Sequence, residues 1–348
     1  MLLVNPTPLP VALVPNAEED RMVTLLLVAA TYHVGEAGLE VAEDQQPLLR
    51  MPPMPLLGDA NPSKMGVSVC VTGFVYAPGG AASQATARLR VGSEERAVAA
   101  FGPRVWREGA GGTLGPTAPL PFDRVEMAWR HAFGGGVRRP TRVVPLAGGG
   151  EAIAPEHDEA CNENPDGVGF YPDRDDALEQ PLPSLEDPAH LQARFDDRPA
   201  PVCFAPYPIY GGLRAAAIVR DGEVAWQEHG RAMTRSAPAT TFAAIPAGTR
   251  VAVEGMRRRG ETFAFDVPAP PVDVEVALGG RATRIRLDTD AIDLDAETAR
   301  VRIVWRAFFA YPLVRFEGRV ARVRATEVFD AMVARAARTS PSTAAAEG

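Results

Sequence analysis

The chain has 348 residues, enough for two domains or for one large β-rich body. Glycine (32) and proline (33) together make about 19% of it, against roughly 12% in an average protein, which argues against a mainly helical fold. The net charge of −8 offers no general attraction for nucleic-acid phosphates or anionic lipid, so we expect neither nucleic acid nor a membrane as partner. Nearly all the positive charge is arginine, with Lys64 the only lysine, a bias that codon usage explains as well as function does.

The three cysteines, Cys70, Cys161 and Cys203, lie far apart and lack the paired spacing of a zinc ribbon or a disulfide framework, which fits a reducing compartment. The apolar opening, Met1 to Val14, is interrupted by prolines and lacks the basic start of a signal peptide. No apolar run approaches the roughly 20 residues that cross a bilayer. We therefore expect a cytoplasmic location.

Most of the regular elements that the sequence indicates are strands. Apolar residues alternate along 23–34, 67–76 and 87–91, the pattern of half-buried strands. Beyond residue 215 the same alternation predicts two hairpins, one around Asp221-Gly222 and one around Gly279-Gly280.

The only convincing helix lies near the end of the chain. There Val328, Phe329, Met332 and Val333 fall on one face, and Thr326 can cap the first turn. Before it, residues 136–205 are crowded with glycine, proline, aspartate and asparagine and show no periodicity. Such a long loop region is either a disordered linker or an ordered functional segment, and its aromatic and leucine residues favour ordering by packing.

We therefore predict a mainly β protein with two packed sheet-rich halves in a sandwich-like or barrel-like arrangement. The predicted units are an N-terminal half (1–135), an irregular central segment (136–205), a C-terminal half (206–323), a short helix (324–337) and a mobile tail (338–348).

Two groups of residues suggest a metal site. His157 and Cys161 could present ligands one helical turn apart, but a second pair is missing, so we interpret them as part of an acidic surface loop. Four aspartates, Asp288, Asp290, Asp293 and Asp295, could hold calcium, but the glycine and glutamate of an EF-hand loop are absent. We interpret them as solvated carboxylates at a strand end and expect no metal or cofactor.

The sequence also leaves two ligand-based functions open. A hydrolase or metal-dependent enzyme could use carboxylates and histidines in residues 126–190, although no G-x-S-x-G, H-E-x-x-H or Walker motif is present. The polar candidates are Glu126, His131, Glu163, Asp166 and Glu186, and a cleft in which Glu126, His131 and Glu186 converge would favour this function. A β-sandwich module that binds carbohydrate or another small ligand would instead need an aromatic-lined pocket.

Five motifs in order resemble a known family. They are Phe101-Gly-Pro-Arg-Val-Trp106, Trp129-Arg-His-Ala-Phe-Gly-Gly135, Asn164-Pro-Asp-Gly-Val-Gly-Phe170, Leu182-Pro-Ser-Leu-Glu186, and Leu287-Asp-Thr289 leading to Val304-Trp-Arg306. Together they are similar to the bacterial type VI secretion adaptor family built on a large domain of unknown function and encoded beside PAAR spike-tip proteins.

The resemblance implies a non-catalytic adaptor or chaperone that binds a toxic effector in the cytoplasm and helps load it on the VgrG/PAAR spike. It carries over no catalytic residue. It marks signature positions that could contact a client: Trp106, Trp129, Phe133, Asn164, Pro165, Gly167, Gly169, Phe170, Pro183 and Glu186. From the residues alone, Asn164 to Phe170 is a rigid turn, in which Pro165 fixes φ, the two glycines permit left-handed geometry and Phe170 anchors the loop on the core.

The chain departs from the family pattern in three places. Pro103 and Arg130 stand where acidic residues are usual, and the tryptophan and Asp-Phe segment expected within 207–245 is missing, so the client could differ from that of relatives. We expect binding through a loop-rich aromatic surface or an exposed strand edge, and the acidic balance favours a basic client segment. The sequence leaves the oligomeric state open.

Overall fold

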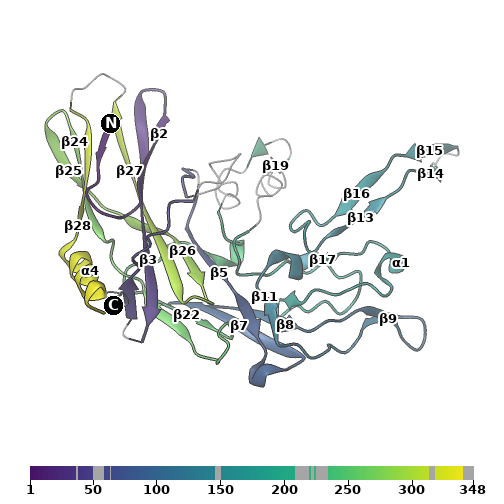
Figure 1. Ribbon diagram of the computed structural model, residues 1–348. Helices are drawn as coiled ribbons and strands as arrows, with labels where there is room; N and C mark the ends of the chain where they lie inside the picture. The colour runs from purple at the N-terminus through teal and green to yellow at the C-terminus, as the bar shows by residue number, and fades with distance from the viewer. Residues whose placement is uncertain are drawn as a thin grey trace, which may run out of the picture.

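The structure is a computed structural model that describes residues 1–36, 38–49, 59–62, 64–145, 150–207, 219–220, 223–224, 234–312 and 318–339. The protein is mainly β, with 48% of the chain in strands and 8% in helices. Three larger sheets form the body of the molecule in Figure 1. A narrow two-stranded hairpin, residues 136–145 and 151–160, projects from this body and is called the arm below.

The largest sheet has the strand order β2-β3-β27-β26-β5-β21, with β4 paired to β3. Its strands are β2 (Val11–Ala17), β3 (Arg21–Gly35), β4 (Gly38–Val41), β5 (Val67–Thr72), β21 (Thr241–Phe242), β26 (Asp288–Asp295) and β27 (Arg300–Pro312). Alternation along these strands separates two faces. Ile292, Ile303 and their neighbours face the main apolar core, whereas Asp293 and Arg302, which lie opposite each other in register, face the other side.

Two smaller sheets complete the body. The five-stranded sheet, in the order β18-β8-β7-β22-β23, contains β7 (Gln84–Val91), β8 (Glu94–Phe101), β18 (Leu185–Glu186), β22 (Arg250–Glu254) and β23 (Phe263–Asp266). The four-stranded sheet, in the order β1-β28-β24-β25, contains β1 (Leu2–Val4), β24 (Val272–Leu278), β25 (Arg281–Ile285) and β28 (Val320–Ala325). Apolar residues of all three sheets meet in one core.

Short ladders form the rest of the β structure. They pair β6 (Phe74–Tyr76) with β11 (Arg124–Glu126), β9 (Trp106–Glu108) with β10 (Leu114–Pro116), β12 (Phe133–Gly134) with β17 (Val168–Gly169), β13 (Gly136–Arg139) with β16 (His157–Ala160), β14 (Arg142–Pro145) with β15 (Glu151–Ala154), and β19 (Val219–Arg220) with β20 (Glu223–Val224). Helical turns are η2 (Pro78–Gly80), η3 (Trp129–His131), α1 (Arg174–Ala177) and η4 (Pro238–Thr240).

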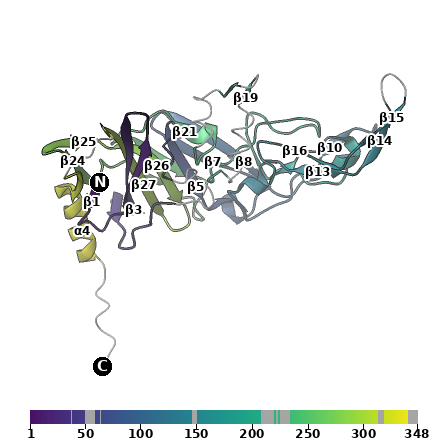
Figure 2. The same ribbon diagram turned by 90° about the horizontal axis from the view of Figure 1, so that it is seen from above.

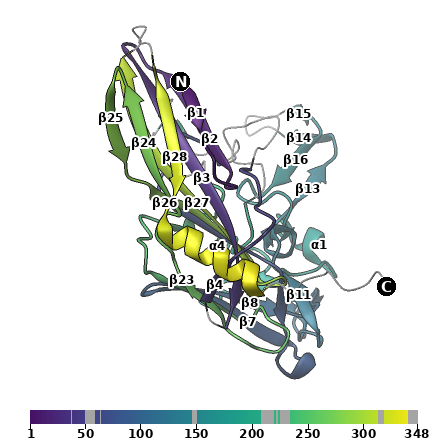
Figure 3. The same ribbon diagram turned by 60° about the vertical axis from the view of Figure 1, so that its left-hand side comes forward.

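The C-terminal helix α4 (Glu327–Thr339) packs against β4 at the edge of the largest sheet (Figure 3). Thr326 caps it as predicted, because its Oγ1 accepts a hydrogen bond from the Phe329 N–H at 3.2 Å. Only two of the four residues predicted to form the apolar face of this helix pack against the body. Phe329 is buried and Met332 packs beside it, but Val328 and Val333 are exposed. No helix in the described ranges combines the length and apolar character needed to cross a bilayer.

The mainly β class and the C-terminal helix are confirmed, and two finer expectations need correction. None of the described sheets closes into a barrel. The strands before and after the central segment also do not form two separate bodies, because β3 pairs with β27, β5 with β26, and β7 with β22. These long-range pairings join both predicted halves within the same sheets.

Individual strand predictions can be compared with the structure. The strands predicted at 23–34, 67–76 and 87–91 correspond to β3, to β5 with β6, and to β7, and the hairpin around Gly279-Gly280 is β24 and β25. The pairing of β19 with β20 confirms the other hairpin, although its turn at 221–222 lies outside the described residues. Most of the expected C-terminal tail also lies outside them, and residues 338 and 339 belong to α4.

Candidate protein-binding site

The central segment, expected to be irregular, contains the arm. Its two ladders, β13 with β16 and β14 with β15, follow each other along one antiparallel hairpin. Figures 1 and 2 show this hairpin extending away from the body, with β14 and β15 at its far end. The arm is thus a long, narrow projection with solvent on most sides.

The far end of the arm exposes two β-branched side chains. Val143 is 60% exposed and Ile153 is 73% exposed, and the two residues lie directly opposite each other in the antiparallel register. Single exposed apolar residues are common on protein surfaces, but a cross-strand pair on a projecting hairpin forms one continuous apolar spot. Covering it with a partner would remove both side chains from water.

The base of the arm consists of the segments at 129–135 and 161–170, from which its two strands start and end, and hydrogen bonds of Asn164 join these segments. The Asn164 Nδ2 donates to the carbonyl oxygens of Trp129 (2.8 Å) and Phe133 (2.9 Å), and the Gly135 N–H donates to the Asn164 oxygen (2.8 Å). At Gly134, with φ of +152°, a Cβ would lie 2.0 Å from the Asn164 carbonyl oxygen. The two chain segments that begin and end the arm therefore approach more closely than any side chain permits.

The two glycines of the predicted rigid turn have different roles. Gly169 adopts a positive φ of +103°, whereas Gly167 does not. Gly167 is needed for close approach instead, because a Cβ there would lie 2.4 Å from the Asn164 Nδ2. Pro165 is half-buried beside the Asn164 contacts, and Phe170 stacks with the Arg198 guanidinium, 4.7 Å from its ring centre.

The motif at 182–186 packs against the base of the arm at Gly169. A Cβ at Gly169 would lie 2.7 Å from the Pro183 ring, and Arg104 forms a buried ion pair with Glu186 while donating to the Pro183 oxygen at 2.7 Å. The other Glu186 oxygen accepts the Gln192 N–H at 3.0 Å. Burial raises the Glu186 pKa, and the Arg104 charge opposes that rise.

Most of the aromatic signature residues are buried. Trp106, Trp129 and Phe133 are at most 5% exposed, and Trp129 donates its ring N–H to the Ala205 oxygen at 3.0 Å. Side chains in such positions can act on a partner only through the segments that they support. At the outer side of the base, Arg139 pairs with Glu159, Asp173 and Asp176 at 2.8–3.0 Å, which ties β13 to α1.

Glu126, His131 and Glu186, whose convergence would favour an enzyme, do not form one hydrogen-bonded group among the described residues. Glu126 pairs with Arg130, Glu186 with Arg104, and no hydrogen bond joins either carboxylate to His131 among the described residues. Burial lowers the His131 pKa, with a further contribution from the Arg130 charge.

The residues proposed as metal ligands are also separated. His157 is exposed on the arm, where its Nδ1 lies 3.0 Å from the Pro155 oxygen, and Cys161 is half-buried at the arm's base. Within the ranges that the structure describes, no three His, Cys, Asp or Glu side chains are close enough to share a metal ion.

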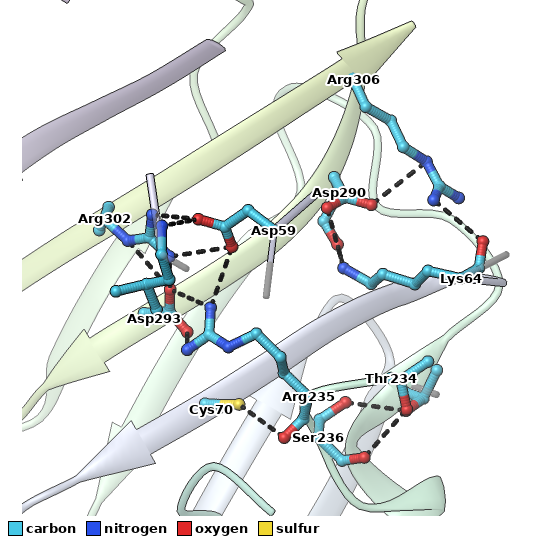
Figure 4. Close-up of polar contacts among 12 residues, drawn as sticks. Asp59, Lys64, Cys70, Thr234, Arg235, Ser236, Asp290, Asp293, Arg302 and Arg306 are labelled. Carbon is cyan, nitrogen blue, oxygen red and sulfur yellow. Dashed lines mark hydrogen bonds and ion pairs between the residues drawn. The ribbon is translucent and has the colours of Figure 1, made fainter. Parts of the chain in front are cut away.

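A buried charge cluster lies on the second face of the largest sheet, and the sequence did not reveal it (Figure 4). It comprises Asp59, Lys64, Arg235, Asp290, Asp293, Arg302 and Arg306. The expectation of solvated aspartates at 288–295 is wrong for two of them, since Asp290 is 1% exposed and Asp293 pairs with Arg235 and Arg302 at 2.7–2.8 Å. In the sequence, the only lysine and the run of aspartates at 288–295 indicated unusual charged positions. The remaining members of the cluster come from distant segments, which only the fold brings together.

The cluster fixes chain segments onto the sheet. Asp59 joins Arg302 (2.7 Å) to Arg235 (3.2 Å), so the segments that carry Asp59 and Arg235 are both held against β27. Burial alone would raise the Asp293 pKa, but the Arg235 and Arg302 charges hold it at about 2. Burial also raises the pKa of the adjacent Cys70 thiol to about 12, so this cysteine is protonated and a poor nucleophile at neutral pH.

The fold and these sites define a multi-sheet β protein whose central segment projects a firmly based arm. The chain belongs to the family described as an uncharacterized protein conserved in bacteria (DUF2169), which matches residues 19–306. The matched range includes the arm, its base and every member of the buried charge cluster. Comparison with curated proteins and with solved structures gives no match.

Proposed function

We propose that this protein is a non-catalytic adaptor that binds a type VI secretion effector and helps to load it on the VgrG/PAAR spike. The observation that carries the proposal is the arm, a projecting hairpin with the exposed Val143 and Ile153 pair at its far end. An adaptor must grip a folded or partly folded polypeptide without changing it chemically. A rigid projection with an apolar spot suits that task.

The construction of the base supports the same proposal. The glycine contacts at Gly134 and Gly167, the buried Asn164 hydrogen bonds and the Arg104–Glu186 ion pair all serve to hold the arm in one place. A preorganised arm loses little conformational freedom when a partner binds, which favours affinity. Four of the five motifs that carry the family resemblance thus support the base of the arm, and the fifth lies at the start of β26 and in β27.

The charges of the arm sharpen the expectation for the client. Arg138 pairs with Glu156, and Arg139 with Glu159, so these charges are compensated within the arm. The apolar pair at the far end of the arm remains exposed. We expect it to contact an apolar part of the client, while the acidic balance of the whole chain favours basic flanking residues.

The experiment is co-expression of the full chain with each protein encoded by the neighbouring genes, followed by gel filtration. We expect a stable complex with an effector or spike-tip protein, and at least a tenfold loss of affinity in the double variant Val143→Asp/Ile153→Asp. Val328→Asp is the matched control, because Val328 is 71% exposed on α4, away from the arm. Equal binding by the arm variant, or no complex with any neighbour, would contradict the proposal.

A further inference from the structure

A groove of about 1080 Å³ lies beside the four-stranded sheet. Its walls include the end of β25 (residues 284–285), the linking residues 286–287, the start of β26 (residues 288–289), the β27 residues Trp305 to Phe308, and two proline-containing loops at 243–247 and 268–270. In Figure 1, β25 and the arm lie at opposite ends of the molecule. The groove is therefore a second candidate surface, separate from the arm.

Arg306 connects this groove to the buried charge cluster (Figure 4). Its Nε lies 3.2 Å from Asp290 and its Nη1 donates to the Lys64 oxygen at 2.9 Å, but its Nη2 has no hydrogen-bond partner among the described residues. Asp290 also pairs with the Lys64 ammonium at 3.0 Å. Two basic side chains thus share one buried carboxylate. When Lys64 is protonated, the three groups carry one excess positive charge at the groove, and burial lowers the Lys64 pKa.

The remaining members of the cluster do not neutralise this excess. Asp59 and Asp293 are matched by Arg235 and Arg302, so that half of the cluster is balanced. A buried or half-buried charge without a counter-ion is costly, and an incoming carboxylate would lower that cost. Arginine is well suited to this contact, because its planar donors can bind a carboxylate with charge-assisted hydrogen bonds.

The rim of the groove offers further contacts. Arg284 pairs with Asp273, and Arg286 with Asp288 at 3.3 Å, and both arginines are more than three-quarters exposed. Exposed ion pairs of this kind contribute little stability, so their arginines can be recruited by a partner at small cost. Phe308, which is 45% exposed and lies 5.7 Å from the Arg306 guanidinium, adds an apolar contact.

The edge of β25 completes the surface. Within the described part of the chain β25 pairs only with β24, so its other backbone edge is open. An open edge can accept an additional strand through main-chain hydrogen bonds, while pockets beside it select the side chains.

We propose that this groove binds an extended acidic segment of a second partner protein, which adds to the edge of β25, places a carboxylate on Arg306 and covers Phe308. The inference deepens the proposed function, since an adaptor needs one surface for its client and another for the apparatus that receives it. The occupant's charge is the opposite of that expected for the segment flanking the arm's apolar contact.

The test uses three short fluorescent peptides in which valine alternates with glutamate, glutamine or lysine, and measures their binding to the full chain by anisotropy. We expect the glutamate peptide to bind at least tenfold more tightly than the others and to slow amide exchange along β25. Arg284→Glu/Arg286→Glu should remove this preference, because both residues are exposed and line the groove. Arg281→Glu is the matched control, since Arg281 lies on the same strand outside the groove and should leave the preference unchanged.

Arg306→Gln should weaken glutamate-peptide binding about tenfold, and its unfolding free energy is measured in parallel because Arg306 also holds Asp290. Equal binding of the three peptides to the native chain, no binding at all, or an equal effect of Arg281→Glu would overturn the inference. If the peptides do not bind the groove but the arm-dependent client complex forms, the groove inference is wrong and the proposed function stands. Groove binding without any arm-dependent complex would contradict the proposed function alone.

Discussion

The arm and the buried charge cluster both contain ion pairs between arginines and carboxylates, but these pairs are exposed on the arm and buried in the cluster. On the arm, Arg138 and Glu156 are 70% and 51% exposed, so water screens their interaction. In the cluster, Arg302 and Asp59 are 2% and 1% exposed, and each depends on the other for compensation. The cluster therefore holds the fold together, whereas the arm presents a surface. Substitutions in the two regions should therefore separate stability from binding.

The largest effect should come from breaking the cluster. Arg302→Met leaves Asp59 and Asp293 with one shared arginine, and we expect a loss of about 3–5 kcal/mol in the free energy of unfolding. Urea denaturation measures the change. Arg250→Met, which removes an exposed ion pair with Asp266, should cost under about 1 kcal/mol. Similar costs for the two variants would contradict the role assigned to the cluster.

Gly134→Ala should be the next most damaging change. Its Cβ would lie 2.0 Å from the Asn164 oxygen at a positive φ, so the base of the arm must shift, at an expected cost of about 2–4 kcal/mol. The control is Gly115→Ala, where no atom lies within 4 Å of the added Cβ. Thermal unfolding of both variants checks this prediction, and a tolerated Gly134→Ala would show that the base is not tightly packed.

Acid should weaken the cluster in a defined pH range. The folded-state pKa of Asp293, about 2, lies below the usual value near 3.9 for an aspartate, so ionised Asp293 stabilises the fold above pH 4. That contribution, about 2–3 kcal/mol, should disappear as the pH falls from about 4 to 2. Denaturation at several pH values should show this loss in the native chain and a flatter profile in Asp293→Asn. Equal slopes for the two proteins would contradict the assignment.

The smallest effect on stability should come from the arm's far end. Val143→Asp/Ile153→Asp changes two side chains that are already exposed, so the free energy of unfolding should change by under about 0.5 kcal/mol. The same variant should lose its client, as described above. A large loss of stability would show that the pair belongs to the fold and not to a binding surface.

Local patterns predicted much of the fold. Alternation located β3, β5 and β7, the paired glycines located the turn between β24 and β25, and Thr326 marked the start of α4. Val328 and Val333 were wrongly expected to be buried for a physical reason. Helical periodicity shows which residues share one face of a helix, but not how much of that face a neighbouring element covers.

Long-range features could not be read in the same way. Asp59, Arg235 and Arg302 meet only because β3, β5, β26 and β27 join distant segments in one sheet. Alternation shows that Asp293 and Ile292 face opposite sides, but not that a loop covers the polar side. The arm was missed because its short strands lie among glycines and prolines, although Val143-Val144 and Ala152-Ile153 flank a glycine run that is typical of a hairpin.

The most direct test of the account is amide hydrogen exchange of the full chain, free and bound to the effector identified by co-expression. We expect binding to slow exchange in β14 and β15, around Val143 and Ile153, and to leave exchange in the cluster strands β26 and β27 unchanged. Unchanged exchange along the arm, with protection elsewhere in the chain, would contradict the claim that the arm holds the client.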